Sequence, residues 1–146
     1  MRLVIQRVKS ASVTVNYEKE VRTIGPGLLI LIAVKRGDVK KDAEILADKL
    51  LKLRILSDSK NKMNLSVTEK KEEIMVISQF TLYADTSKGN RPSFIKAADP
   101  IEAKNLYQVF IERLKNSGVG VATGRFGDYM HIKNELDGPV TIILES

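Results

Sequence analysis

The sequence predicts a single compact α/β domain with layers ordered α/β/β, in which two helices cover a mixed sheet and further strands form a second, smaller sheet. Three observations predict this fold class. Polar and apolar residues alternate near the start of the chain, as in half-buried strands. The nearly continuous apolar run LLILIAV at 28–34 is typical of a strand covered on both faces. Between the strands, two segments carry apolar residues at helical spacing.

The first part of the chain is expected to be mostly β-structure. Strands are predicted over 3–8 and 11–15 with a bend between them, and a turn over 16–20 should lead to a short strand ending at Ile24. The segment GPG at 25–27 then breaks the run before the apolar strand.

The middle of the chain predicts one helix, a polar loop and a central strand. Asp38 is expected to cap a helix over 39–53, because its apolar residues fall on one face. The stretch 54–71 is polar and should form a loop with one short strand. A further strand is predicted over 73–83.

The second helix has the clearest boundaries. Asp99 is expected to be the N-cap, Pro100 the first helical residue and Glu102 the reciprocal capping carboxylate, and Gly118 should end the helix. The rest of the chain predicts three more strands, at 119–126, 130–136 and 140–145.

Composition narrows the classes of function. The chain has 146 residues, 24 Lys and Arg against 18 Asp and Glu, and a net charge of +6, which favours a polyanionic partner such as RNA, although basic enzymes without one are common. It has no cysteine, so disulfides and thiolate chemistry are excluded. With one histidine, His131, and no carboxylates at metal-ligand spacing, we expect no metal site. No signal pattern or membrane-spanning run occurs, so a cytoplasmic protein is expected.

The segment ISQFTL at 77–82 is the first candidate for chemistry. Ser78, Gln79 and Thr81 interrupt an apolar strand, and one interpretation is that they bond to neighbouring backbone at a sheet edge. The alternative is that the strand end exposes N–H groups and a hydroxyl at a pocket, where they hold a developing oxyanion. Thr81 has no obvious base apart from His131, which argues against a Ser or Thr triad.

Two further segments are candidates for binding. Gly138-Pro139 between strands is either a simple turn or a cis peptide whose carbonyl oxygens receive a ligand ammonium. The segment KGNRPSF at 88–94 places two cations, a serine and an aromatic ring together, a composition that can hold a phosphate and stack a base. Its alternative interpretation is a solvated turn anchored by Phe94.

Six short motifs occur in an order that is similar to a known family. The chain resembles the D-aminoacyl-tRNA deacylases, also called D-tyrosyl-tRNA deacylases, essentially from end to end. The motifs are IQRV at 5–8, KMNLSV at 62–67, SQFTL at 78–82, RPSF at 91–94, TGRFG at 123–127 and GPVT at 138–141. One position departs from the family pattern, because Leu136 stands where the family usually has Asn.

The resemblance implies one deacylase-like domain over 1–146 that forms a homodimer with active sites at the subunit interface. It implies hydrolysis of the ester between a D-amino acid and the terminal adenosine of tRNA, a proofreading step that needs no cofactor. The partner is then the acceptor end of aminoacylated tRNA, which would account for the basic surplus.

The resemblance also assigns roles to substrate-binding residues. Gly138 and Pro139 would present two carbonyl groups to the substrate α-ammonium and leave no room for the side chain of an L-residue. Arg7 would hold this segment in place. Phe94 and Met130 are expected among the substrate-binding residues.

Catalysis is expected at the strand end. By resemblance, Phe80 and Thr81 would contribute N–H groups near the scissile carbonyl, while Ser78 and Gln79 would support the pocket or contact the adenosine. Thr81 has been assigned as a nucleophile within this family. Because the sequence offers it no evident base, attack by water with help from a free ribose hydroxyl of the tRNA is the preferred mechanism.

Overall fold

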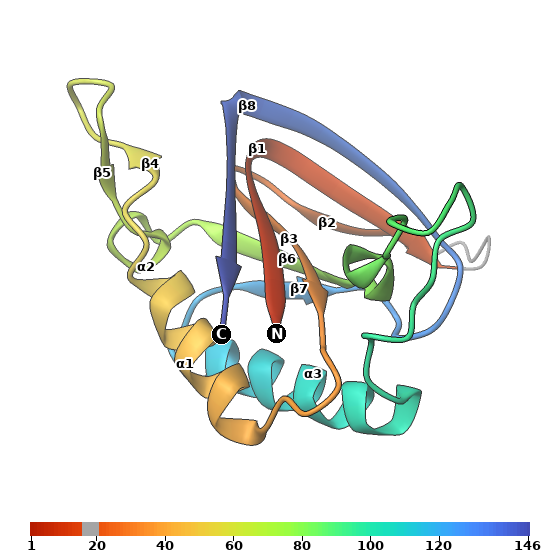
Figure 1. Ribbon diagram of the computed structural model, residues 1–146. Coiled ribbons are helices and arrows are strands. Elements are labelled where there is room, and N and C mark those ends of the chain that lie inside the picture. Colours follow the sequence, from red (N-terminus) through yellow and green to blue (C-terminus); the bar gives the residue numbers. More distant parts are fainter. Residues whose placement is uncertain (16–20) are drawn as a thin grey trace.

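The computed structural model describes residues 1–15 and 21–146 (Figure 1), so the turn predicted over 16–20 lies outside the described residues. The elements, in chain order, are β1 (Arg2–Val15), β2 (Val21–Ile24), β3 (Gly27–Ala33), α1 (Lys40–Leu51), β4 (Leu56–Ser57), β5 (Met63–Leu65), α2 (Val67–Lys70), β6 (Glu73–Ser78), the 3₁₀ helix η1 (Phe80–Tyr83), α3 (Pro100–Lys115), β7 (Val121–Thr123) and β8 (Met130–Glu145).

The main sheet is mixed, as predicted, and is organised around the long strand β1. Its order is β2-β1-β3-β6-β7, with β8 paired to the other edge of β1. β3 runs parallel to β6, and β6 parallel to β7, whereas β1 is antiparallel to its three partners. The β1–β8 register shifts between Gln6 and Val8 and again between Val8 and Ser10, and the second shift overlaps the bend predicted between residues 8 and 11. The bend lets the first half of β1 pair with β3 and its second half with β2.

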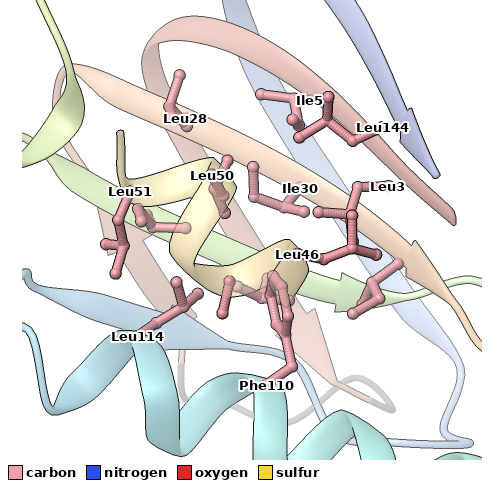
Figure 2. Packing of buried hydrophobic residues seen from close by; sticks show 14 of the residues in the cluster. Leu3, Ile5, Leu28, Ile30, Leu46, Leu50, Leu51, Phe110, Leu114 and Leu144 are labelled. Atoms are coloured by element: carbon pink, nitrogen blue, oxygen red, sulfur yellow. The ribbon is translucent and has the colours of Figure 1, made fainter. Parts of the chain in front are cut away.

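Two helices cover one face of this sheet. Figure 2 shows the side chains of α1 and α3 meeting those of β1 and β3, with Leu46, Leu50 and Phe110 fully buried between the layers. Alternate strand residues such as Leu3 and Ile30 point into the same cluster, because successive side chains of a strand lie on opposite faces. The helix-covered face is therefore the larger core.

The other face of β3 and β6 is covered by the bent part of the sheet itself. Leu29, Met75 and Ile77 pack there with a second set of buried residues from the far half of β1 and from β2, namely Val8, Ala11, Val13 and Ile24. The two clusters give three layers in the predicted α/β/β order. β3 is consequently buried on both faces, as its continuous apolar run indicated.

The second, small sheet is formed by β4 and β5, in the stretch predicted to be a loop with one short strand. That prediction was wrong in two respects, because the stretch holds two strands and also the short helix α2. Ser66 caps α2, and the Glu69 carboxylate accepts a hydrogen bond from the Ser66 N–H at 2.7 Å. The Ser-x-x-Glu spacing of this capping box was the signal for the helix.

The cap predicted for α1 was also wrong. The N-cap residue is Val39, whose N–H donates to the Asp42 carboxylate at 2.8 Å. Asp38 instead accepts from the Lys35 N–H at 2.6 Å and pairs with the Met1 ammonium at 2.7 Å. Asp38 thus closes the turn before the helix, and the helix spans less than the predicted 39–53.

The cap of α3 is confirmed, since the Asp99 carboxylate accepts from the Ile101 N–H at 2.9 Å. The reciprocal bond expected from Glu102 is not among the contacts of the described residues, and α3 ends at Lys115, before Gly118.

The last part of the chain forms fewer strands than predicted. β7 covers only three residues of 119–126, and β8 is one strand where the sequence predicted two. β1 explains this continuity, because it pairs with β8 on both sides of Gly138-Pro139. In the part of the chain that the structure describes, no helix is long and apolar enough to cross a membrane.

Candidate active site at the end of the parallel strands

The polar residues of ISQFTL lie where β6 ends, and not inside a strand as predicted. Gln79 makes the last ladder bond, from its N–H to the Ile32 carbonyl at 2.8 Å, and the chain then turns into η1. β3 ends at Ala33. The residues of η1 have no neighbouring strand with which to pair in the described part of the chain. Their backbone groups therefore form short-range hydrogen bonds, such as that from the Leu82 N–H to the Gln79 carbonyl at 3.2 Å.

The first N–H groups of η1 are left without acceptors. Among the described residues, neither the Phe80 nor the Thr81 N–H makes a hydrogen bond, as expected for the opening positions of a helical turn. Phe80 is 58% exposed and Thr81 is exposed, so both groups lie near the surface. This arrangement offers two neighbouring donors to an incoming carbonyl oxygen.

The Thr81 hydroxyl accepts a hydrogen bond from the Gln79 side-chain amide. An amide N–H is a donor and cannot remove a proton. His131 stands between Met130 and Ile132, which line the cavity described below, but His131 is not itself among the lining residues. Among the described contacts of Thr81 there is therefore no general base.

A cavity of about 660 Å³ opens at this strand end. It is bounded by the carboxyl ends of β3 and β6, the start of α3 and the segment leading into β8. Its lining includes five of the predicted site residues: Ser78, Gln79, Phe80, Phe94 and Met130. In open α/β sheets the carboxyl ends of parallel strands are the usual place for a ligand. The location of the cavity agrees with that rule.

Aromatic groups form much of the wall, and sequence reasoning found only some of them. Phe80 and Phe94 meet edge to face with ring centroids 5.0 Å apart. Tyr107 and Phe126 line the inner part, and the Tyr107 hydroxyl donates to the Val76 carbonyl at 3.1 Å. Burial raises the pKa of Tyr107, which keeps the hydroxyl protonated. Sequence reasoning missed Tyr107, although the hydroxyl on an otherwise apolar helix face was a signal that could have found it.

Gly138 and Pro139 lie elsewhere on the chain. Their peptide bond is cis, and both residues are exposed within β8. Arg7 contacts the neighbouring Asp137 twice, with Nε 2.8 Å from the carboxylate and 3.2 Å from the carbonyl oxygen. The Arg7 Nη1 also donates to the Ile55 carbonyl at 3.0 Å. These contacts tie the Gly-Pro segment to β1 and to the start of the small sheet.

Within one chain, the predicted residues Arg7, Gly138 and Pro139 lie apart from those at the end of β6. Arg7 lies opposite Leu28 in the β1–β3 register, whereas Ser78 lies opposite Ile32 in the β3–β6 register. These two positions are four residues apart on β3, which is about 13 Å along a strand. Arg7, Gly138 and Pro139 are absent from the cavity lining, and so is Thr81, which follows the lining residue Phe80.

The described residues include no group of three or more His, Cys, Asp or Glu side chains that could hold a metal ion. The cavity lining at the strand end offers N–H groups, hydroxyl and amide side chains, the Asp128 carboxylate and an apolar wall.

The fold and the cavity define an α/β protein with an open cavity at the carboxyl ends of its parallel strands. Residues 4–145 match the family model described as D-Tyr-tRNA(Tyr) deacylase, and the chain belongs to this family. The predicted membership, and with it the prediction that the chain is an enzyme, is confirmed.

Curated relatives agree over the full chain. A D-aminoacyl-tRNA deacylase of Dehalococcoides mccartyi is 54% identical over 146 residues, covering 100% of this chain and 95% of the relative. One from Thermosipho melanesiensis is 49% identical over 147 residues, covering 100% and 97%.

Solved structures share the fold. The structure of a c-Myc DNA Unwinding Element Binding Protein is 39% identical, with a TM-score of 0.91, and the match covers 100% of this chain and 99% of that one. A probable eukaryotic D-amino acid tRNA deacylase has a TM-score of 0.86 at 17% identity, over 99% and 98% of the two chains, and shows the likeness of the fold alone.

Proposed function

We propose that this protein hydrolyses the ester bond of D-aminoacyl-tRNA and releases free D-amino acid and tRNA, as a chiral proofreading step of translation in the cytoplasm. The observation that carries the proposal is the family match over residues 4–145, within one deacylase-like domain over 1–146. The cavity supports it, because it is lined by Ser78, Gln79 and Phe80 of the SQFTL motif.

In the proposed reaction, water attacks the scissile carbonyl with help from the free ribose hydroxyl of the terminal adenosine. The Phe80 and Thr81 N–H groups stabilise the oxyanion, since they are adjacent and have no acceptor among the described residues. Thr81 does not act as nucleophile, because the described contact of its hydroxyl is the Gln79 amide and not a base. Ser78 and Gln79 support this end of the pocket or contact the adenosine.

We propose that backbone groups of the protein distinguish D- from L-aminoacyl substrates. The Gly138 and Pro139 carbonyls receive the substrate α-ammonium, and the segment excludes the side chain of an L-residue. Arg7 acts as a positioning residue through its contacts with Asp137. Phe94 and Met130, which line the cavity, contact the substrate.

This mechanism requires two chains, and we propose a homodimer in which Gly138 and Pro139 of one subunit face the strand end of the other. β8 is suited to be part of the interface, because it pairs only with β1 among the described strands. It also exposes Ile132, Leu136 and Ile143, the last of them at 61%. Leu136, at the departure from the family pattern, thus lies on the proposed contact surface.

The function is tested by incubating the protein with D-tyrosyl-tRNA and L-tyrosyl-tRNA and following the deacylation of each. Release of D-tyrosine alone is expected. Release from neither substrate would leave a tRNA-binding protein without this activity. Equal release from both would instead indicate a hydrolase that does not read chirality through Gly138 and Pro139.

The two-chain site is tested by mixing two inactive variants. Phe80→Pro removes one proposed oxyanion donor. Gly138→Ala places a Cβ 2.7 Å from the Val140 nitrogen at a φ of +130°, which displaces the Gly-Pro segment. Random exchange of subunits makes half of the dimers mixed, each with one intact site of two, so about a quarter of the normal activity should return. Each variant alone is the control, and a mixture no more active than its components would mean that each chain builds its own site.

A further inference from the structure

The loop that follows η1 passes the mouth of the cavity and is fixed at its base. Asp85 and Ser93 exchange two backbone hydrogen bonds, of 2.8 and 2.9 Å, and the Asp85 carboxylate pairs with the Lys96 ammonium at 2.9 Å. Hydrogen bonds from Ser87 and Lys96 hold the pKa of Asp85 well below its usual range. Phe94, directly after this closed loop, lines the cavity.

A second basic segment lies against the foot of the loop. The Arg36 N–H donates to the Lys96 carbonyl at 3.0 Å, and Lys35 forms an antiparallel bridge with Ala97. The neighbouring residues Val34 and Ala98 line the cavity. Lys35 and Arg36 are therefore held at the rim of the pocket by backbone bonds.

The acidic residues in and beside these two segments already form ion pairs or cap a helix. Asp38 pairs with the Met1 ammonium at 2.7 Å, Asp85 with Lys96 at 2.9 Å, and Asp99 caps α3. The cations that remain are Lys35, Arg36, Lys88 and Arg91. All four are exposed, and none forms an ion pair with a residue in the ranges 1–15 and 21–146.

We propose that these four cations form the surface that holds the phosphates of the tRNA acceptor end while its terminal adenosine and amino acid occupy the cavity. The inference rests on the proposed function. It identifies the residues that make the protein bind tRNA more tightly than a small ester without phosphates. Lys and Arg contacts to phosphate fix the position of a nucleic acid and add affinity through counterion release. The closed loop supports this role, because cations carried on a fixed base lose less conformational freedom on binding.

The test neutralises the loop tip with the double variant Lys88→Gln/Arg91→Gln. Its matched control is Lys49→Gln/Lys52→Gln, which removes the same charge from exposed lysines at the far end of α1, beside α2 in Figure 1. Two measurements are made on the full chain of each protein. One is the Kd for uncharged tRNA at several salt concentrations, and the other is the hydrolysis of D-tyrosyl-adenosine, an ester without phosphates.

The loop variant is expected to bind tRNA about 10- to 50-fold more weakly near 0.1 M salt, with a log Kd–log salt slope smaller by about 1.4 to 1.8. It should cleave D-tyrosyl-adenosine normally, and the helix variant should match the unmodified protein. The exchange Lys88→Arg/Arg91→Lys should restore tRNA binding.

Two results would overturn the inference. The first is that tRNA binding changes no more in the loop variant than in the helix variant. The second is that the loop variant loses hydrolysis of D-tyrosyl-adenosine by the same factor as tRNA binding, which would mean that the loop supports the pocket and does not bind phosphate. If the unmodified protein binds tRNA with the expected salt dependence but cleaves no ester, the proposed function fails and the phosphate surface stands.

Discussion

Replacing Gly27 by alanine is expected to lower the free energy of unfolding by about 3 kcal/mol, the upper part of the range for overpacked interiors. A Cβ at this position would lie 2.0 Å from the Glu73 carbonyl oxygen and 2.9 Å from its carbonyl carbon. Gly27 and Glu73 are the first pair of the parallel β3–β6 ladder. Gly27 is buried, and the residues that follow Gly27 and Glu73 are packed in the core, which limits how far either backbone can move.

Gly25 offers a matched control two residues away. A Cβ there would meet only the Glu73 Oε2, at an ordinary 3.7 Å. Gly25→Ala should therefore change stability by no more than about 0.5 kcal/mol. Urea unfolding of both variants measures the difference. If Gly27→Ala proves as mild as Gly25→Ala, the close approach of β3 and β6 at this point is not a constraint on the fold.

The same two glycines show what local sequence can and cannot predict. The segment GPG predicted a break in the chain, and β2 does end just before it. The requirement for glycine at position 27 comes from Glu73, which is 46 positions later and becomes its neighbour only through the parallel pairing. Long-range contacts of this kind leave no periodicity in the sequence, whereas the buried strand β3 and the apolar stripe of α3 do.

For the candidate site too, the sequence predicted what depends on neighbouring residues and not what depends on long-range pairing. The grouping of Ser78, Gln79 and Phe80 at one place follows from their closeness in sequence, and all three line the cavity. That this run ends as a strand at Ser78 depends on the length of β3, which the run itself does not encode. Gly138-Pro139 was expected to be a turn or a cis peptide; it is cis, but it sits inside β8 because β1 pairs on both sides.

Phe80→Pro is expected to lower kcat about 100- to 1,000-fold, the usual effect of losing one oxyanion donor. Proline removes the Phe80 N–H but suits the first position of a helical turn, where that N–H makes no bond within the described structure. Phe80→Ala is the matched control, since it also loses the ring that contacts Phe94 but keeps the N–H. Single-turnover hydrolysis of D-tyrosyl-tRNA, with circular dichroism to verify folding, separates the two.

Thr81→Ala completes this comparison, because it removes the hydroxyl and leaves the backbone N–H. If the strand end acts through its N–H groups, Thr81→Ala should retain most of its activity, and the Gln79 amide that loses its acceptor can turn to water at this exposed position. A nucleophilic threonine would reverse the order, with Thr81→Ala inactive and Phe80→Pro the milder change. The ranking of the three variants therefore distinguishes an oxyanion site built from backbone from covalent catalysis by a side chain.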